Sequence, residues 1–239
     1  MTSTAPKNVG VVGGGRMGAG IAQVFATLGS TVTIAESGDR QAALQRVSDG
    51  LDRAHERGKL GDVDPATILG RVSTVAAPDA LPPALDLVVE AVPELVDLKL
   101  SVLSLVEKTV DPSTVIASNT SSISIAELGS ALSDPARLIG MHFFNPVPAS
   151  TLVEIVRAPA TDAGVVEKVR EWVAQLGKTE VLVNDSPGFA TSRLGVCLGL
   201  EAIRMSAARA MPSPAPTQAP PTATTTGTRT PASARSSGL

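Results

Sequence analysis

The segment from Val9 to Ser37, VGVVGGGRMGAGIAQVFATLGSTVTIAES, most constrains the fold that this chain can adopt. The apolar run at its start predicts a buried strand, and a helical pattern of apolar residues follows it. Between strand and helix stand Gly13, Gly15 and Gly18, with the spacing G-x-G-x-x-G. A second apolar run, Thr31–Ala35, completes a strand–helix–strand unit, which is the context that this glycine spacing requires.

Each glycine has a physical task at this junction. Gly13 permits the tight turn, Gly15 lets the backbone approach a pyrophosphate, and Gly18 lets helix and strand pack closely. The positive end of the helix dipole stabilises such a pyrophosphate. Glu36 ends the second strand, where a carboxylate accepts hydrogen bonds from an adenosine ribose diol. A carboxylate repels a 2′-phosphate, so the pattern favours NAD over NADP, although Arg40 nearby weakens that preference.

Composition excludes several classes of protein. The 239 residues are 43% hydrophobic and 18% charged, which is globular, and a net charge of −3 gives no basic field for nucleic acid. The N-terminus has no secretory signal, and no apolar run is long enough to span a membrane. The single cysteine, Cys197, suits a reducing cytoplasm, and its apolar surroundings predict a buried, inert thiol. Two histidines and one cysteine leave no metal cluster.

Apolar runs and helical patterns alternate along the first 205 residues. A continuous apolar run such as Leu85–Ala91 is typical of a parallel sheet that is covered on both faces. We therefore predict an α/β fold, a Rossmann-type doubly wound and mainly parallel sheet. Further strands are predicted at Arg71–Val75, Val115–Ala117, Leu138–Phe144, Leu152–Val156 and Lys178–Val183. Further helices are predicted at Asp39–Lys59, Leu95–Thr109, Ile125–Leu132, Ala163–Leu176 and Phe189–Met205.

The composition changes sharply after Met205. Residues 206–239 consist almost wholly of Ala, Pro, Thr, Ser, Gly and Arg. Such a segment buries too little apolar surface to offset the entropy of ordering, so we predict that it is disordered.

Polar side chains cluster where the predicted strands end. Glu94 follows one strand, and Ser118–Ser122 follows the next, either as site residues or as caps of the following helix. His142 lies near the end of a strand, and Glu154 lies on the following one. A carboxylate in contact with an imidazole stabilises the imidazolium and makes it a better base.

Five motifs, GGGRMG, VVEAVPE, ASNTSS, GMHFFNP and SPGF, occur in this order. With them the chain, from Lys7 to Met205, resembles the L-3-hydroxyacyl-CoA dehydrogenases, particularly the bacterial 3-hydroxybutyryl-CoA dehydrogenases. The resemblance implies a cytoplasmic oxidoreductase of fatty acid metabolism and beta-oxidation. It would oxidise an L-3-hydroxyacyl-CoA reversibly to the 3-ketoacyl-CoA, with hydride passing to NAD.

The resemblance also implies roles for individual residues. His142 matches the catalytic base and Glu154 its partner. Ser121 matches a residue that binds substrate near the reacting oxygen, and Asn145 matches a position beside the pocket. Lys59 matches a lysine that meets the CoA phosphates. Cofactor contacts are implied for Gly13, Gly14, Gly15, Arg16, Met17, Gly18, Glu36, Glu94, Lys99 and Asn119.

The chain departs from the family in two places. Ser192 stands where many members carry an asparagine, which puts its contact with the substrate in question. The family continues past Met205 into a helical domain that completes the cleft and forms a homodimer. We therefore expect an NAD-binding domain at 1–188, the first helix of a truncated domain at 189–205, and the tail at 206–239. Our hypothesis is that the reading frame shifts near Ser206, and we expect the loss of the helical domain to impair both dimer formation and turnover.

Two other readings stay open. One is a related dehydrogenase of the same fold that acts on a sugar acid or another 3-hydroxy acid. The other is a truncated, non-catalytic NAD-binding remnant, which would bind the cofactor without turnover.

Overall fold

The computed structural model describes residues 5–210 of the chain, and side-chain environments within 5–207. An eight-stranded sheet has the order β3-β2-β1-β4-β5-β6-β7-β8. Strands β1 to β6 are parallel, β7 is antiparallel to β6, and β8 is parallel to β7. This topology confirms the predicted doubly wound, mainly parallel fold. The strands are β1 (Asn8–Val12), β2 (Thr31–Ala35), β3 (Val72–Val75), β4 (Leu87–Glu90), β5 (Val115–Ser118), β6 (Leu138–Phe143), β7 (Leu152–Arg157) and β8 (Thr179–Asn184).

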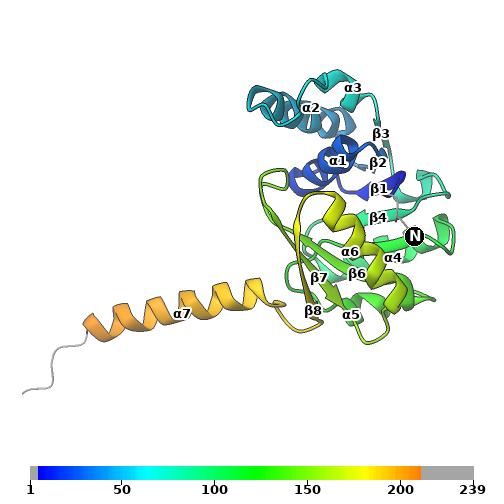
Figure 1. Cartoon of the computed structure of the whole chain (residues 1–239). Coiled ribbons are helices and arrows are strands. Elements are labelled where there is room, and N and C mark those ends of the chain that lie inside the picture. Colours follow the sequence, from blue (N-terminus) through cyan, green and yellow to red (C-terminus); the bar gives the residue numbers. More distant parts are fainter. Residues whose placement is uncertain (1–4, 211–239) are drawn as a thin grey trace, which may run out of the picture. The chain divides into compact units, whose positions relative to one another are not determined.

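Helices cover both faces of the sheet (Figure 1). One apolar core lies under α1, α2, α3 and α6, and a second lies under α4 and α5. Alternate residues of one strand enter different cores: Val9 and Val11 belong to the first and Val12 to the second. The helices are α1 (Arg16–Leu28), α2 (Arg40–Glu56), α3 (Pro65–Leu69), α4 (Val96–Thr109), α5 (Ile125–Gly129), α6 (Ala163–Gln175) and α7 (Thr191–Ala210), with 3₁₀ turns at Pro78–Ala80 and Pro135–Arg137.

Several helix boundaries differ from the predicted ones for local reasons. Helix α2 ends at Glu56 instead of Lys59, and Gly58 follows in a left-handed conformation with φ of 66°. The short helix α3 was not predicted. It begins at Pro65 after Asp64, whose side chain accepts a hydrogen bond from the N–H of Ala66.

The end of α7 corrects the predicted boundary of the tail. The helix was expected to end at Met205, but it continues to Ala210 because Ser206–Ala210, SAARA, is rich in the best helix-forming residue. The rest of the predicted tail, 211–239, lies outside the described residues. Helix α7 begins in the unit that ends at Leu198, and the second unit starts at Gly199.

The side chains of α7 are mainly exposed. Leu194, Val196 and Leu198 are each more than 60% exposed. Cys197 is also exposed, so the expectation of a buried thiol was wrong. The apolar neighbours of Cys197 along the chain do not bury it, because they are themselves in solvent.

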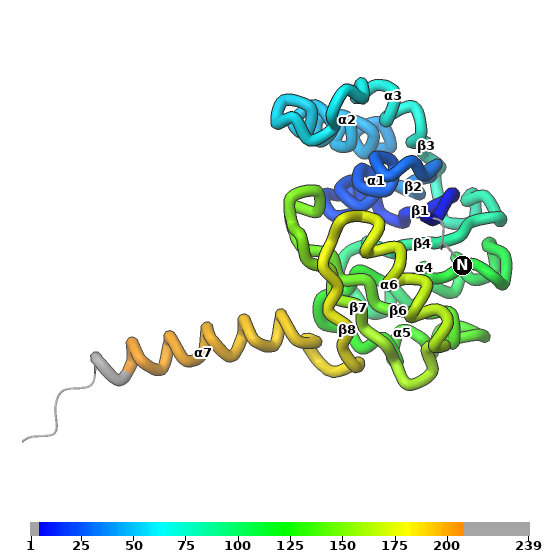
Figure 2. The backbone as a smooth tube through the Cα atoms, in the orientation of Figure 1, coloured from blue at the N-terminus to red at the C-terminus, as the bar shows by residue number. Residues whose placement is uncertain are grey.

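The connection between β6 and β7 lies against α1 (Figure 2). A Cβ atom at Gly20 would come within 2.9 Å of the Cβ of Val147, so only glycine permits this approach. The connection begins with Phe144, and a cis peptide bond joins Asn145 to Pro146. Asn145 lines the same cavity as Met17 of the first turn of α1. None of the helices within residues 5–210 is long and apolar enough to cross a membrane.

Candidate active site

The turn between β1 and α1 gives each glycine of the motif a different environment. Gly13 has φ of 99°, a left-handed conformation that favours glycine. A Cβ atom at Gly18 would lie 1.8 Å from the carbonyl oxygen of Gly13, so strand and helix approach too closely for any side chain. A Cβ atom at Gly15 would meet nothing within 4 Å, so this part of the turn faces open space.

The N-terminus of α1 has no side-chain cap. Asp39, Asp64 and Asp162 accept hydrogen bonds from the first turns of α2, α3 and α6, whereas α4, like α1, has no side-chain cap. The first N–H groups of a helix have no partner within the helix, and phosphate oxygens are suitable acceptors for them. The uncapped turn and the open space at Gly15 therefore fit the pyrophosphate of a dinucleotide.

The carboxylate of Glu36 lies beneath this turn. It accepts hydrogen bonds from the N–H groups of Gly14 and Gly38, each at 2.7 Å. The carbonyl oxygen of Gly14 accepts a hydrogen bond from Arg46 Nη1 at 3.1 Å. A Cβ atom at Gly14 would lie 2.5 Å from the Cβ of Ala43, so α2 packs directly on the turn. The structure thus places Glu36 beside the glycine turn, as the sequence pattern requires.

The antiparallel pairing of β6 and β7 brings His142 opposite Glu154. Nδ1 of His142 lies 2.9 Å from Oε2 of Glu154, and both side chains are buried. Burial raises the pKa of Glu154, but hydrogen bonds from Thr191, His142 and Ala190 outweigh it and hold the pKa below its ordinary value. An ionised carboxylate only accepts hydrogen bonds, so Nδ1 is the donor to Glu154, and in a neutral imidazole Nε2 is then the acceptor.

A second carboxylate, Glu94, organises the polar segment after β5. Its Oε1 accepts hydrogen bonds from Thr120 Oγ1 at 2.6 Å and from the N–H of Ser121 at 2.9 Å, with further bonds from Ser122. Oγ of Ser121 donates to the same oxygen at 3.2 Å. Burial raises the pKa of Glu94, but Thr120, Ser121 and the nearby Lys99 ammonium together lower it to about 2.

Lys99 is buried with two carboxylates around it. Its Nζ lies 2.8 Å from Oε1 of Glu90 and 3.2 Å from Oε2 of Glu94. Glu90 also accepts a hydrogen bond from Ser118 Oγ at 2.6 Å and one from the N–H of Val92 at 2.7 Å. The sequence did not predict this network, which joins the end of β4 to the end of β5.

A cavity of ≈ 330 Å³ lies at the carboxyl ends of β4, β5 and β6. Open α/β sheets bind their ligands at this edge. Asn119 closes part of the wall, since its Oδ1 accepts a hydrogen bond from the N–H of Phe143 at 2.8 Å. Seven of the predicted site residues line the cavity: Met17, Glu94, Lys99, Asn119, Ser121, His142 and Asn145. The rest of its lining is Ala91, Val92, Phe143 and Phe144.

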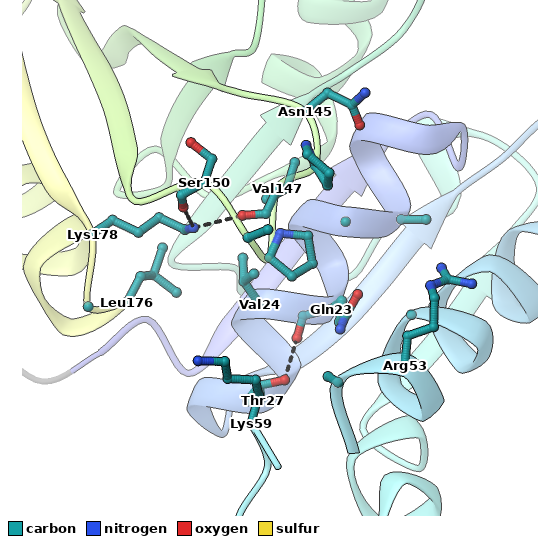
Figure 3. Close-up of a pocket in the computed structure, with 18 of the residues that line it drawn as sticks. Gln23, Val24, Thr27, Arg53, Lys59, Asn145, Val147, Ser150, Leu176 and Lys178 are labelled. Atoms are coloured by element: carbon teal, nitrogen blue, oxygen red, sulfur yellow. Dashed lines mark hydrogen bonds between the residues drawn. The ribbon is translucent and has the colours of Figure 1, made fainter. Parts of the chain in front are cut away.

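A larger groove of ≈ 970 Å³ lies between α1, α2 and the connection from β6 to β7 (Figure 3). Asn145 lines both this groove and the cavity, so the two adjoin. Gln23, which is buried, also lines the groove from α1. Asp49 is the acidic residue of the lining. The basic side chains of the lining are Arg16, Arg46, Arg53, Arg57, Lys59 and Lys178.

Some predicted residues lie apart from the cavity. Lys59 and Arg16 line the groove instead. Ser192 lines neither space and belongs to the first turn of α7. Sequence reasoning also missed Lys178, whose Nζ donates to the carbonyl oxygens of Val147 (2.7 Å) and Ser150 (2.5 Å). No sequence signal marked Lys178, because its partners are backbone atoms about thirty positions away.

The fold and this site define a Rossmann-type, NAD-dependent oxidoreductase. Residues 8–186 match the family described as 3-hydroxyacyl-CoA dehydrogenase, NAD binding domain. The chain belongs to this family, as the motifs in its sequence indicated.

Similar proteins are known from both sequence and structure. The probable 3-hydroxybutyryl-CoA dehydrogenase of Deinococcus radiodurans is 40% identical over 199 residues, which is 82% of this chain and 70% of that protein. The structure of M. tuberculosis FadB2 has a TM-score of 0.81 at 38% identity and covers 86% of this chain and 73% of that one. The (S)-3-hydroxybutyryl-CoA dehydrogenase of Ralstonia eutropha has a TM-score of 0.81 at 39% identity, covering 87% and 74% of the two chains.

Proposed function

We propose that this protein catalyses the reversible, NAD-dependent oxidation of a short-chain L-3-hydroxyacyl-CoA, such as 3-hydroxybutyryl-CoA, to the 3-ketoacyl-CoA. The observation that carries the proposal is the buried His142–Glu154 pair, whose histidine lines a cavity that adjoins a groove with six basic side chains. The names of the relatives from Deinococcus radiodurans and Ralstonia eutropha support this substrate class.

In this proposal His142 is the general base. Nε2 accepts the proton of the substrate's 3-hydroxyl group as its carbon loses a hydride, and Glu154 stabilises the imidazolium that forms. Ser121 and Asn145 hydrogen-bond the reacting oxygen. The bound cofactor supplies the acceptor for the hydride.

The chain's own residues bind and orient the two ligands in this proposal. The glycine turn and the first turn of α1 hold the pyrophosphate of NAD, and Glu36 accepts hydrogen bonds from the adenosine ribose. Lys59 and the other cations of the groove bind the phosphates of CoA, since phosphate is the ligand class that Lys and Arg favour. The acyl end of the substrate then passes Asn145 and enters the cavity.

The test is turnover by the purified chain, followed as NADH formation. We expect oxidation of (S)-3-hydroxybutyryl-CoA and little or none of free 3-hydroxybutyrate. Turnover of free hydroxy or sugar acids without the CoA ester would instead identify a related dehydrogenase. NAD binding without any turnover would identify a non-catalytic module.

The role of His142 is tested by substitution. His142→Gln should lower kcat by about 10²–10⁴-fold, the usual contribution of a general base, and leave NAD affinity nearly intact. Because Glu154→Gln acts through the same imidazole, the double variant should lose much less than the product of the two single losses. A near-native kcat in His142→Gln would remove this residue from the mechanism.

A further inference from the structure

The chain turns sharply between β8 and α7, and it does so beside the His142–Glu154 pair. Gly188 and Phe189 both adopt left-handed conformations, with φ of 73° and 51°. A non-glycine residue rarely takes this conformation, so the surrounding structure must hold Phe189 there. Its side chain is buried, and the ring centroid lies 6.1 Å from that of His142. The turn therefore directs the next two residues toward the pair.

Those two residues supply three hydrogen bonds to Glu154. Oε1 accepts from the N–H groups of Ala190 and Thr191 at 2.8 and 3.0 Å. Oε2 accepts from Thr191 Oγ1 at 2.6 Å and lies 2.9 Å from Nδ1 of His142. Glu154 is 0% exposed, so these donors and His142, not bulk water, satisfy its carboxylate.

The strand register alone does not fix this arrangement. Pairing of β6 with β7 sets His142 opposite Glu154, but it leaves the carboxylate plane free to rotate about the last side-chain torsion. The two N–H groups hold Oε1, and the hydroxyl of Thr191 meets the oxygen that faces the imidazole. The last torsion of Glu154 is thus held by Ala190, just before α7, and by Thr191, its first residue.

We propose that Thr191 is a positioning residue for the proposed reaction: its hydroxyl holds Oε2 of Glu154 toward Nδ1 of His142. Its action on kcat rests on the proposed function, whereas its action on the carboxylate does not. A hydrogen bond to an ionised acceptor stabilises the charged form, so Thr191 also keeps Glu154 ionised. The lowered pKa of Glu154 agrees with this role.

The test compares Thr191→Val, which removes the hydroxyl with little change of shape, with Thr191→Ser, which keeps it. In protein labelled with ¹³C at the glutamate carboxyl groups, the signal absent from Glu154→Gln identifies Glu154. We expect this carboxylate to titrate at a higher pH in Thr191→Val than in the native protein, and Thr191→Ser to restore the native titration. If Thr191→Val does not fold, Thr191→Ala takes its place.

The kinetic readout separates positioning from a general structural role. A hydrogen bond to a charged group contributes enough free energy for about a tenfold effect, so kcat in Thr191→Val should fall roughly tenfold with little change in KM. Thr191→Ser should keep most of the native kcat. In a Glu154→Gln background the same substitution should change kcat no further, because the carboxylate through which Thr191 acts is gone.

Several results would overturn the proposal. An unchanged titration of Glu154 in Thr191→Val would do so, as would a Thr191→Ser protein that behaves like Thr191→Val. A further loss of kcat in the Glu154→Gln background would assign Thr191 a separate role. The titration requires no turnover, so it still decides the question if the chain oxidises no acyl-CoA.

Discussion

Glu94 stays ionised to a low pH because five donors of one polar segment, together with Lys99, surround its carboxylate. Its folded-state pKa of about 2 lies below the ordinary value of 4.5. Between these two values the folded state binds fewer protons than the unfolded state, so stability falls as the pH falls. We predict that Glu94→Gln flattens this loss between about pH 4.5 and pH 2, as measured by urea unfolding at a series of pH values.

The matched control is Asp62→Asn, which removes the same charge. Asp62 is exposed, and it accepts no hydrogen bond from the residues that the structure describes. Because Glu107 and Glu154 also have lowered pKa values, some acid sensitivity remains in every variant. If the stability of Glu94→Gln changed with pH in parallel with that of the native protein, the ionised Glu94 side chain would not contribute to stability.

The site residues show what a sequence can and cannot reveal at this scale. His142 and Glu154 were predicted because a histidine and a glutamate on successive strands are chemically specific. The contacts that hold them were not, since Thr191 is thirty-seven positions from Glu154 along the chain. Lys99 was assigned to the cofactor, and only the fold shows that Glu90 neutralises it.

In the turn between β1 and α1, an added methyl group should have different effects at two glycines: it should lower stability at Gly18 and weaken cofactor binding at Gly15. In Gly18→Ala the new Cβ would collide with a backbone oxygen, so strand and helix must move apart. We predict a loss of about 1–3 kcal/mol in the free energy of unfolding, the range for overpacked sites. Denaturant unfolding measures it.

Gly15→Ala is the matched variant at the same turn. Gly15 has φ of −68°, which alanine adopts easily, and its Cβ would meet nothing within 4 Å. Stability should therefore stay constant or rise slightly. NAD affinity should fall, because the methyl group occupies the space through which a pyrophosphate approaches. Native NAD affinity in a stable Gly15→Ala protein would argue against the proposed cofactor position.

Elements with strong local signals were predictable, and those with weak signals were not. The β1–α1–β2 unit follows from apolar periodicity and the glycine spacing, and β2 has the predicted bounds, Thr31–Ala35. Helix α3 is only five residues long and carries too little periodicity to detect. The start of α7 was placed two residues early, because a left-handed Phe189 has no sequence signal.

Across the whole molecule, basic side chains gather in one groove although the chain as a whole is negatively charged. The chain carries a net charge of −3, yet six basic side chains and one acidic side chain line the groove beside α1. The basic residues come from α1, α2, the segment after α2 and the connection before β8, so no local stretch of sequence is strongly basic. Composition alone therefore hides this feature, which only the packing of distant segments creates.

This distribution makes a prediction about salt. Exposed charges are screened within about 8–10 Å at 0.1–0.15 M salt, so binding of coenzyme A, a polyanion, should weaken as salt is added. Removing two cations in Arg53→Gln/Lys59→Gln should weaken binding at low salt by about tenfold and reduce its dependence on salt. Calorimetric titration with coenzyme A at several salt concentrations measures both quantities.

The matched control is Lys108→Gln, which makes the chain more negative without touching the groove. Lys108 lies in the last turn of α4, the helix that covers the other face of the sheet from α1. If the net charge of the chain governed binding, each lysine or arginine would contribute equally, and Lys108→Gln would show half the loss of the double variant. If the groove governs it, Lys108→Gln should bind coenzyme A like the native protein. If Lys108→Gln and Arg53→Gln/Lys59→Gln lost the same coenzyme A binding free energy per charge removed, the groove would not be the binding site for the phosphates of CoA.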